Sequence, residues 1–160
     1  MRLARTLRFD DSDTRVFPLA AEAGEWAVSG AFAFSDWTEE RLTGPDRQAF
    51  ANGWLGLESF GRATFVAVAR IEPSEMEAVI DRLAAHFVAE WGAPDIAAAR
   101  PVAEEEVAHM ASLCEGHAPN TLIVVERSLV EAGVREAFRT IAPSDATLDL
   151  VAMHGSLDEG

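Results

Sequence analysis

His109, Cys114 and His117 are the residues of this chain whose types most readily bind a transition metal. If their segment is helical, His109 lies about 140° around the helix from Cys114, so the two side chains point to different faces. His109 is better placed to pair with Glu105 and Glu106, four and three residues earlier on the same face. The spacing favours a core thiol and an exposed ion pair, and a metal site using His109, Cys114 and His117 is kept as the alternative.

A second group of potential ligands, Asp10-Asp11-Ser12-Asp13, follows the first expected strand. Carboxylates this close together can hold Mg²⁺ or Ca²⁺. The spacing does not match the calcium loop of an EF-hand, and Asp and Ser are also common turn residues. We therefore expect a turn at this position.

The segment Phe50–Arg62 combines glycines and aromatic residues at a density unusual for a solvated loop. The glycines are Gly53, Gly56 and Gly61. The favoured interpretation is a tightly packed helix-to-strand connection whose aromatic side chains enter the core. The alternative is the wall of a ligand pocket or a subunit interface, and the candidate ligand or interface residues are then Trp54, Glu58, Phe60 and Arg62.

Three known glycine motifs do not fit this segment. The dinucleotide fingerprint needs a first Gly-x-Gly between a strand and a helix, and here the glycines precede a strand. The Gly-x-x-Gly of nucleic-acid-binding loops needs basic neighbours, whereas Trp54 and Leu55 stand here. The nucleophile elbow that Ser59 faintly suggests lacks its first glycine. No catalytic residue is predicted.

Composition excludes several further classes of function. The chain has 160 residues, a net charge of −14 and thirteen basic residues, all of them Arg. The absence of Lys excludes Schiff-base chemistry and a P-loop lysine. The negative charge opposes binding to nucleic acid or to anionic lipid, so neither partner is expected. One Cys excludes an intrachain disulfide, and no apolar run approaches the ~20 residues of a membrane span, so we expect a cytoplasmic protein.

The elements that would position these residues follow from hydrophobic periodicity. Strands are expected over residues 2–9, 25–34, 63–71, 121–126 and 147–153, and helices over 45–52, 74–91, 101–116 and 128–141. The helix from Ser74 is indicated by two signals, because Ser74 and Glu77 match a capping box and a helical apolar stripe follows. In the segment Glu25–Phe34, large apolar residues alternate with Ala and Ser, which predicts a strand with one flat face suited to close docking.

This order of elements predicts one α+β domain over residues 1–153, followed by a polar tail at 154–160. The expected architecture is a two-layer sandwich, in which a mainly antiparallel sheet of about five strands carries helices on one face. A three-layer α/β arrangement is the alternative.

The block from Asn52 to Val66 (NGWLGLESFGRATFV) and the segment Gly24–Phe34 resemble a family of short uncharacterised bacterial proteins. The resemblance runs over most of the chain. It implies a domain of unknown function and transfers no activity to any residue. It also implies a link with genes for cofactor ligases and for molybdoenzyme maturation.

The leading hypothesis from the sequence is a cytoplasmic, non-catalytic accessory or binding protein that forms a homodimer. One reason is that the sequence shows no set of catalytic residues. The other is that the flat strand face and the aromatic segment offer more apolar surface than one small core needs. The second hypothesis is a small-molecule-binding domain or enzyme with a pocket walled by Gly53–Gly61. The third is the metal protein described above. No cofactor is predicted.

Overall fold

The computed structural model describes residues 1–9 and 12–143, which form an α+β fold around one antiparallel sheet. The strands are β1 (Arg2–Leu7), β2 (Trp26–Val28), β3 (Trp54–Gly56), β4 (Arg62–Ala63), β5 (Phe65–Arg70), β6 (Leu122–Val130) and β7 (Gly133–Ile141). They lie in the order β4-β3-β2-β1-β5-β6-β7. The expected sheet of about five strands is therefore too small, because β3 and β7 form where no strand is expected and β4 is separate from β5.

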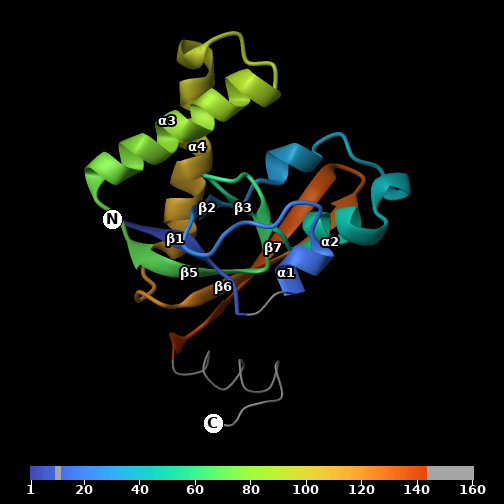
Figure 1. The fold of residues 1–160 in the computed structure, drawn as a ribbon, viewed down its shortest axis with the longest axis horizontal. Helices are drawn as coiled ribbons and strands as arrows, with labels where there is room; N and C mark the ends of the chain where they lie inside the picture. Colours follow the sequence, from blue (N-terminus) through green and yellow to red (C-terminus); the bar gives the residue numbers. More distant parts are fainter. Residues whose placement is uncertain (10–11, 144–160) are drawn as a thin grey trace.

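The sheet curls, so its two ends approach each other (Figure 1). This approach is marked by the contact between Trp54 on β3 and Phe138 on β7, whose rings stack with centroids 5.8 Å apart. The α+β class is confirmed, but the curled sheet does not match a flat two-layer sandwich. Curling brings residues from both ends of the sheet into one site.

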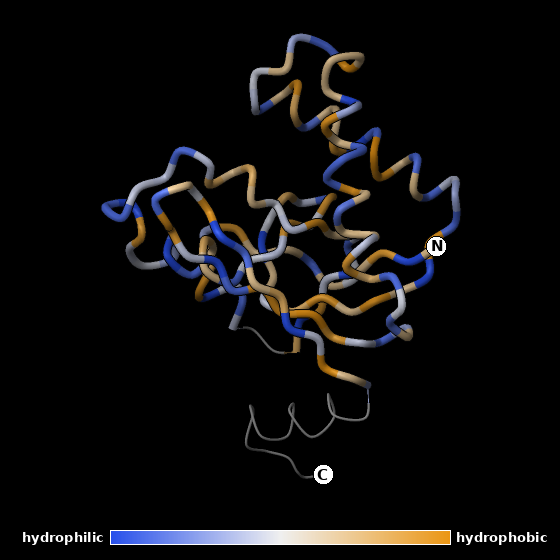
Figure 2. The backbone as a smooth tube through the Cα atoms, turned by 180° about the vertical axis from the view of Figure 1, so that it is seen from behind, coloured by the Kyte–Doolittle hydropathy of each residue, from blue (hydrophilic) through white to orange (hydrophobic). Residues whose placement is uncertain are grey.

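Two long helices cover one face of the sheet as an antiparallel hairpin. The helices of the described chain are α1 (Ser12–Val16), α2 (Gly44–Asn52), α3 (Pro73–Glu90) and α4 (Ile96–Cys114), with short 3₁₀ turns η1 (Ala31–Phe34) and η2 (Glu39–Arg41). α4 lies on the strands and α3 packs on α4, and the far end of the hairpin projects beyond the sheet (Figure 1). Apolar and polar residues alternate along the hairpin, as its amphipathic packing requires (Figure 2).

Both long helices start where side chains other than those predicted cap them. The N-cap of α3 is Glu72, which exchanges reciprocal hydrogen bonds with Glu75, so the capping box lies two residues before the expected Ser74. α4 starts five residues before Pro101, because Asp95 accepts a hydrogen bond from the Ala98 N–H at 2.8 Å. The Asp95 cap sets the start of α4, so Pro101 lies inside the helix and not at its beginning.

The expected strand over residues 25–34 is wrong in its second half. β2 ends at Val28, Gly30 has a left-handed φ of 75°, and the chain turns into η1. The flat Ala/Ser face predicted there does not exist, and Ala27 and Ser29 are buried within the chain. The glycine conformation, which only a residue without Cβ adopts easily, ends the alternation.

The helix expected over residues 128–141 is also wrong. β6 and β7 form a hairpin in which Val130 pairs with Gly133, and Gly133 has a φ of 129°. Val134 and Phe138 are four residues apart, which suits a helical stripe and a strand face equally. The expected strand at 147–153 and the polar tail lie outside the described residues.

The remaining predicted elements are confirmed: a first strand, a helix beginning beside Pro45, a central strand at β5 and a strand from Leu122. Within the described residues, none of the helices combines the length and apolar character needed to cross a membrane.

Candidate functional site

The glycines of the Phe50–Arg62 segment are required by close contacts with the protein's own chain. A Cβ at Gly61 would lie 2.5 Å from the backbone of Ala20, and one at Gly56 would lie 2.5 Å from the Glu25 carboxylate. Gly53 is similarly crowded by α2 and by the Arg62 side chain. This supports the favoured interpretation of the segment, which is close packing of the chain upon itself.

A buried carboxylate fixes the turn between β3 and β4. Glu25 is 3% exposed and accepts hydrogen bonds from the N–H groups of Glu58 and Ser59 at 2.9 and 2.8 Å and from the Ser59 hydroxyl at 2.7 Å. It also accepts from the Glu22 N–H at 2.7 Å. Burial raises the pKa of Glu25, but these hydrogen bonds outweigh that effect and hold its pKa below the usual value. The turn is thereby held in one conformation.

That conformation places Phe60 in an unusual backbone geometry. Phe60 has a φ of 58°, a left-handed backbone value that residues with a Cβ rarely adopt. Its ring stacks on the His86 imidazole, with centroids 3.7 Å apart and planes 5° from parallel. The imidazole Nε2 in turn accepts a hydrogen bond from the Trp91 indole N–H at 3.2 Å. Three rings from the β3–β4 turn and the end of α3 are thus connected.

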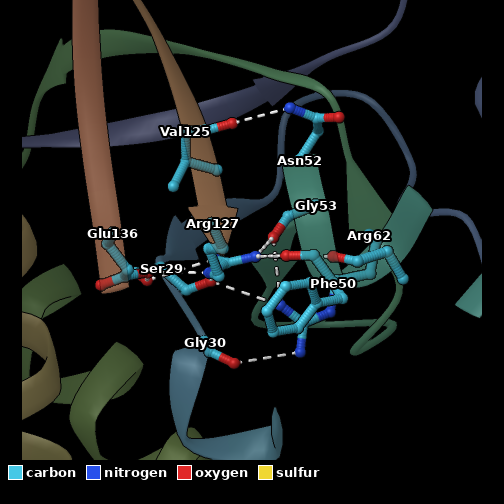
Figure 3. Close-up of polar contacts among 10 residues, drawn as sticks. Ser29, Gly30, Phe50, Asn52, Gly53, Arg62, Val125, Arg127 and Glu136 are labelled. Atoms are coloured by element: carbon cyan, nitrogen blue, oxygen red, sulfur yellow. Dashed lines mark hydrogen bonds and ion pairs between the residues drawn. The ribbon is translucent and has the colours of Figure 1, made fainter. Parts of the chain in front are cut away.

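Beside this aromatic group lies a buried arginine pair. Arg127, on β6, donates from Nε to the Glu136 carboxylate at 2.8 Å, and Glu136 also accepts from the Ser29 hydroxyl. Arg127 Nη1 donates to the carbonyl groups of Phe50 and Gly53, and Nη2 donates to that of Ser29 (Figure 3). Because the first two carbonyls are at the C-terminal end of α2, Arg127 satisfies groups that the helix itself leaves without donors.

Arg62 approaches the same carbonyl groups from β4. Its Nη1 donates to the carbonyls of Ser29 and Gly53 at 3.3 and 3.2 Å, and its Nη2 donates to the Gly30 carbonyl at 3.1 Å. Figure 3 shows both guanidinium groups converging on these oxygens. Burial, followed by the charge of Arg127, lowers the pKa of Arg62 to about 9, and Glu136 acts in the opposite direction. The Phe34 ring packs against both guanidinium groups.

The arginine pair and the aromatic group border a surface depression. It consists of two adjoining hollows of about 380 and 480 Å³. The residues common to both hollows are Leu19, Ala33, Phe60, Arg62 and Trp91. Trp91 is 48% exposed and Leu19 is 56% exposed, although both are large and apolar. We call this combined hollow the aromatic depression. Its volume is that of a pocket for a small organic molecule.

Of the residues singled out in the Phe50–Arg62 segment, the structure brings two together at the aromatic depression. Phe60 and Arg62 both line it. Trp54 is fully buried in the core, where its indole N–H has no acceptor among the described residues. Glu58 is exposed and borders a different, smaller hollow beside Trp26.

The proposed metal ligands lie in separate surroundings. Cys114 is buried among apolar side chains, and burial raises the pKa of its thiol to about 12. His109 contacts the edge of the Phe138 ring, and the His117 carbonyl accepts from Arg2. Within residues 1–9 and 12–143, no three His, Cys, Asp or Glu side chains are grouped as metal ligands would be.

The predicted acidic turn is described only in part, because Asp10 and Asp11 lie outside the described residues. Ser12 begins α1, and the buried Asp13 accepts a hydrogen bond from the Thr64 hydroxyl at 3.0 Å.

Several residues of the site escape prediction from the sequence. Periodicity places Trp91 on the apolar stripe of its helix, whereas it lies at the C-cap of α3 and is half exposed. His86 falls off that stripe, yet it is partly buried beneath Phe60. Glu136 falls inside the helix expected over 128–141 and Arg127 just before it, so the predicted elements relate neither residue to Arg62. An available signal is the pairing of Arg127 with Glu136 across a hairpin turn marked by Gly133.

Comparison with known proteins places the chain in context. A family model described as "Family of unknown function (DUF6505)" matches residues 1–159. No curated protein and no solved structure matches the chain.

Proposed function

The chain belongs to DUF6505, a family of unknown function, and from this premise we propose that it is a binding protein that holds a small planar molecule in the aromatic depression. The proposal corresponds to the pocket predicted from the sequence, but with a different set of lining residues. Phe60 and Arg62 remain, and Trp91 and His86 replace Trp54 and Glu58.

The observation that carries this proposal is the ring arrangement at Phe60. A left-handed φ at a bulky residue costs free energy, and such conformations persist where surrounding contacts impose them. Here the Glu25 hydrogen bonds impose it, and the result is a Phe60–His86 stack beside the half-exposed Trp91. Flat aromatic surfaces of this kind favour a planar ligand that adds a further ring to the stack.

Binding rather than catalysis is supported by the polar groups of the same depression. The Ser59 hydroxyl donates to Glu25, whose lowered pKa makes this carboxylate a weak base for activating a nucleophile. His86 Nε2 accepts a hydrogen bond from the Trp91 indole N–H. This hydrogen bond engages the ring nitrogen that a general base would use.

The homodimer and the link with cofactor or molybdoenzyme maturation remain predictions. Of the features that suggested a dimer, Trp54 is in the core and Ser29 is buried, whereas Phe60 lines the aromatic depression. Light scattering at micromolar protein concentration tests the dimer, which a species of 17.3 kDa would contradict.

A ligand-detected NMR screen of small planar fragments tests the binding function. It is run on the wild type, on Trp91→Ala and on the matched control Val102→Ala. Val102 is 49% exposed, much like Trp91, and lies on α4 outside the depression. We expect fragments to bind the wild type and Val102→Ala alike, and Trp91→Ala about tenfold more weakly. Equal affinity for all three proteins, or no binding at millimolar concentration, would contradict the proposal.

A further inference from the structure

The charge at the base of the aromatic depression is not balanced. Arg62 is 8% exposed and has no carboxylate within 4.0 Å among the described residues; its polar partners there are neutral carbonyl groups. The nearby carboxylate of Glu136 is held by Arg127 and the Ser29 hydroxyl. Two guanidinium groups therefore share one carboxylate, which leaves one excess positive charge. A buried charge without a counterion is costly, and carbonyl dipoles offset that cost only in part.

Other acidic residues near the depression do not supply the missing counterion. Asp36, Asp46 and Glu90 line its rim; Asp36 and Glu90 are exposed to solvent and Asp46 is partly exposed. Asp46 lies 3.9 Å from Arg41, with its side chain 42% exposed. Water screens such exposed charges strongly, so their effect on a buried guanidinium is small. The uncompensated charge is thus at the base, and the negative charges surround the entrance.

A ligand that fits the aromatic side chains of the depression and the uncompensated charge of Arg62 carries an aromatic ring and an anionic group. We infer that the aromatic depression binds small aromatic carboxylates, with the ring against Phe60 and Trp91 and the carboxylate directed toward Arg62. This inference rests on the proposed function and adds the chemical class of the ligand. The carboxylate would supply the counterion that Arg62 lacks, and a charged hydrogen bond in a buried site is about twice as strong as a neutral one.

Three small aromatic probes of similar size differ in charge: benzoate, benzamide and benzylammonium. Each is titrated by NMR at neutral pH into the wild-type protein and into Trp91→Ala. We expect benzoate to bind roughly tenfold more tightly than benzamide, and benzylammonium to bind more weakly than either. Raising the salt concentration is expected to reduce the affinity for benzoate and leave that for benzamide unchanged.

The outcomes distinguish this inference from the function on which it rests. Equal binding of benzoate and benzamide, with loss of both in Trp91→Ala, would overturn the carboxylate inference and leave the binding function standing. Tighter binding of benzylammonium would overturn it as well. Failure of all three probes, together with failure of the fragment screen, would overturn both.

Discussion

Arg62 and Arg127 donate hydrogen bonds to the same two carbonyl oxygens, those of Ser29 and Gly53. Arg62 lies on β4 at one end of the sheet and Arg127 on β6 near the other, so the shared oxygens connect the two ends. The two guanidinium groups carry like charges and repel each other. The pair is held together by the shared carbonyl groups and by one carboxylate, that of Glu136. The arginine pair is both part of the fold and the base of the proposed binding site.

Replacing Glu136 by Gln tests the electrostatics of the arginine pair. The variant leaves two buried guanidinium groups without a carboxylate, and we expect it to lower the free energy of unfolding by about 3 kcal/mol. Glu126→Gln is the matched control on the exposed face of β6, with an expected change within about 0.5 kcal/mol. Denaturant titration measures both, and equal stabilities would show that Glu136 contributes nothing to the pair.

Gly61→Ala tests whether the glycines are required by close packing. Its Cβ would meet the Ala20 backbone on the neighbouring chain segment, which cannot move aside like a flexible side chain. We expect a loss of about 3 kcal/mol. Gly92→Ala is the control, because Gly92 has a φ of 79° and a Cβ there would meet no atom within 4 Å, so only backbone strain of about 1 kcal/mol applies. A smaller loss at Gly61 than at Gly92 would contradict the packing requirement.

The lowered pKa of Glu25 predicts loss of stability in acid. The folded state binds this proton less readily than the unfolded state does, so the contribution of Glu25 is present above the ordinary pKa of 4.5 and is lost as the pH falls through the folded pKa. We expect Glu25→Gln to reduce stability at pH 7 and to flatten its dependence on pH between about 5 and 3. Thermal unfolding of both proteins over that interval checks this. An unchanged dependence would mean that other carboxylates cause the acid loss.

The His86–Trp91 hydrogen bond predicts a second pH effect. Burial lowers the pKa of His86, the charge of Glu90 raises it and that of Arg62 lowers it further, with a net decrease. The neutral imidazole is thus favoured on folding, so its contribution is present above the ordinary pKa of 6.5 and is lost as the pH falls through the folded pKa. Protonation also removes the acceptor at Nε2, and we expect the Trp91 indole signal to shift with that titration.

His86→Gln provides the control for this titration. The Gln amide oxygen can accept a hydrogen bond from the Trp91 indole N–H, and the amide does not titrate. The pH dependence of the indole signal should therefore disappear in the variant. Two-dimensional NMR of the indole N–H groups is the measurement. Persistence of the shift in His86→Gln would assign it to a group other than His86.

The parts of the fold that the sequence predicts are those with one strong local pattern. The stripe of α3 is found because burial on one side dictates its period, and β5 is found because it is a short apolar run buried on both faces. The hairpin at Gly133 is missed because residues four apart on a strand share a face, as they nearly do on a helix. The turn at Gly30 is missed because the alternation of residue types continues through a change of backbone conformation.

The candidate site is predictable only at Phe60 and Arg62, which are close in sequence. Arg127 and Glu136 join them through the curl of the sheet, a long-range arrangement with no local signal. Trp91 joins them through the length of α3, which carries its end over the β3–β4 turn. Sequence spacing therefore identifies one wall of the depression and cannot supply the others.

The four tryptophans of the chain give the most direct test of the binding site. Trp37 and Trp91 line the aromatic depression, whereas Trp54 is in the core and Trp26 borders another hollow. The measurement is the shift of the four indole N–H signals on titration with benzoate. We expect shifts at Trp91 and Trp37 with one shared dissociation constant and none at Trp26 and Trp54. No shift at Trp91, or a larger shift at Trp26, would contradict binding in the aromatic depression.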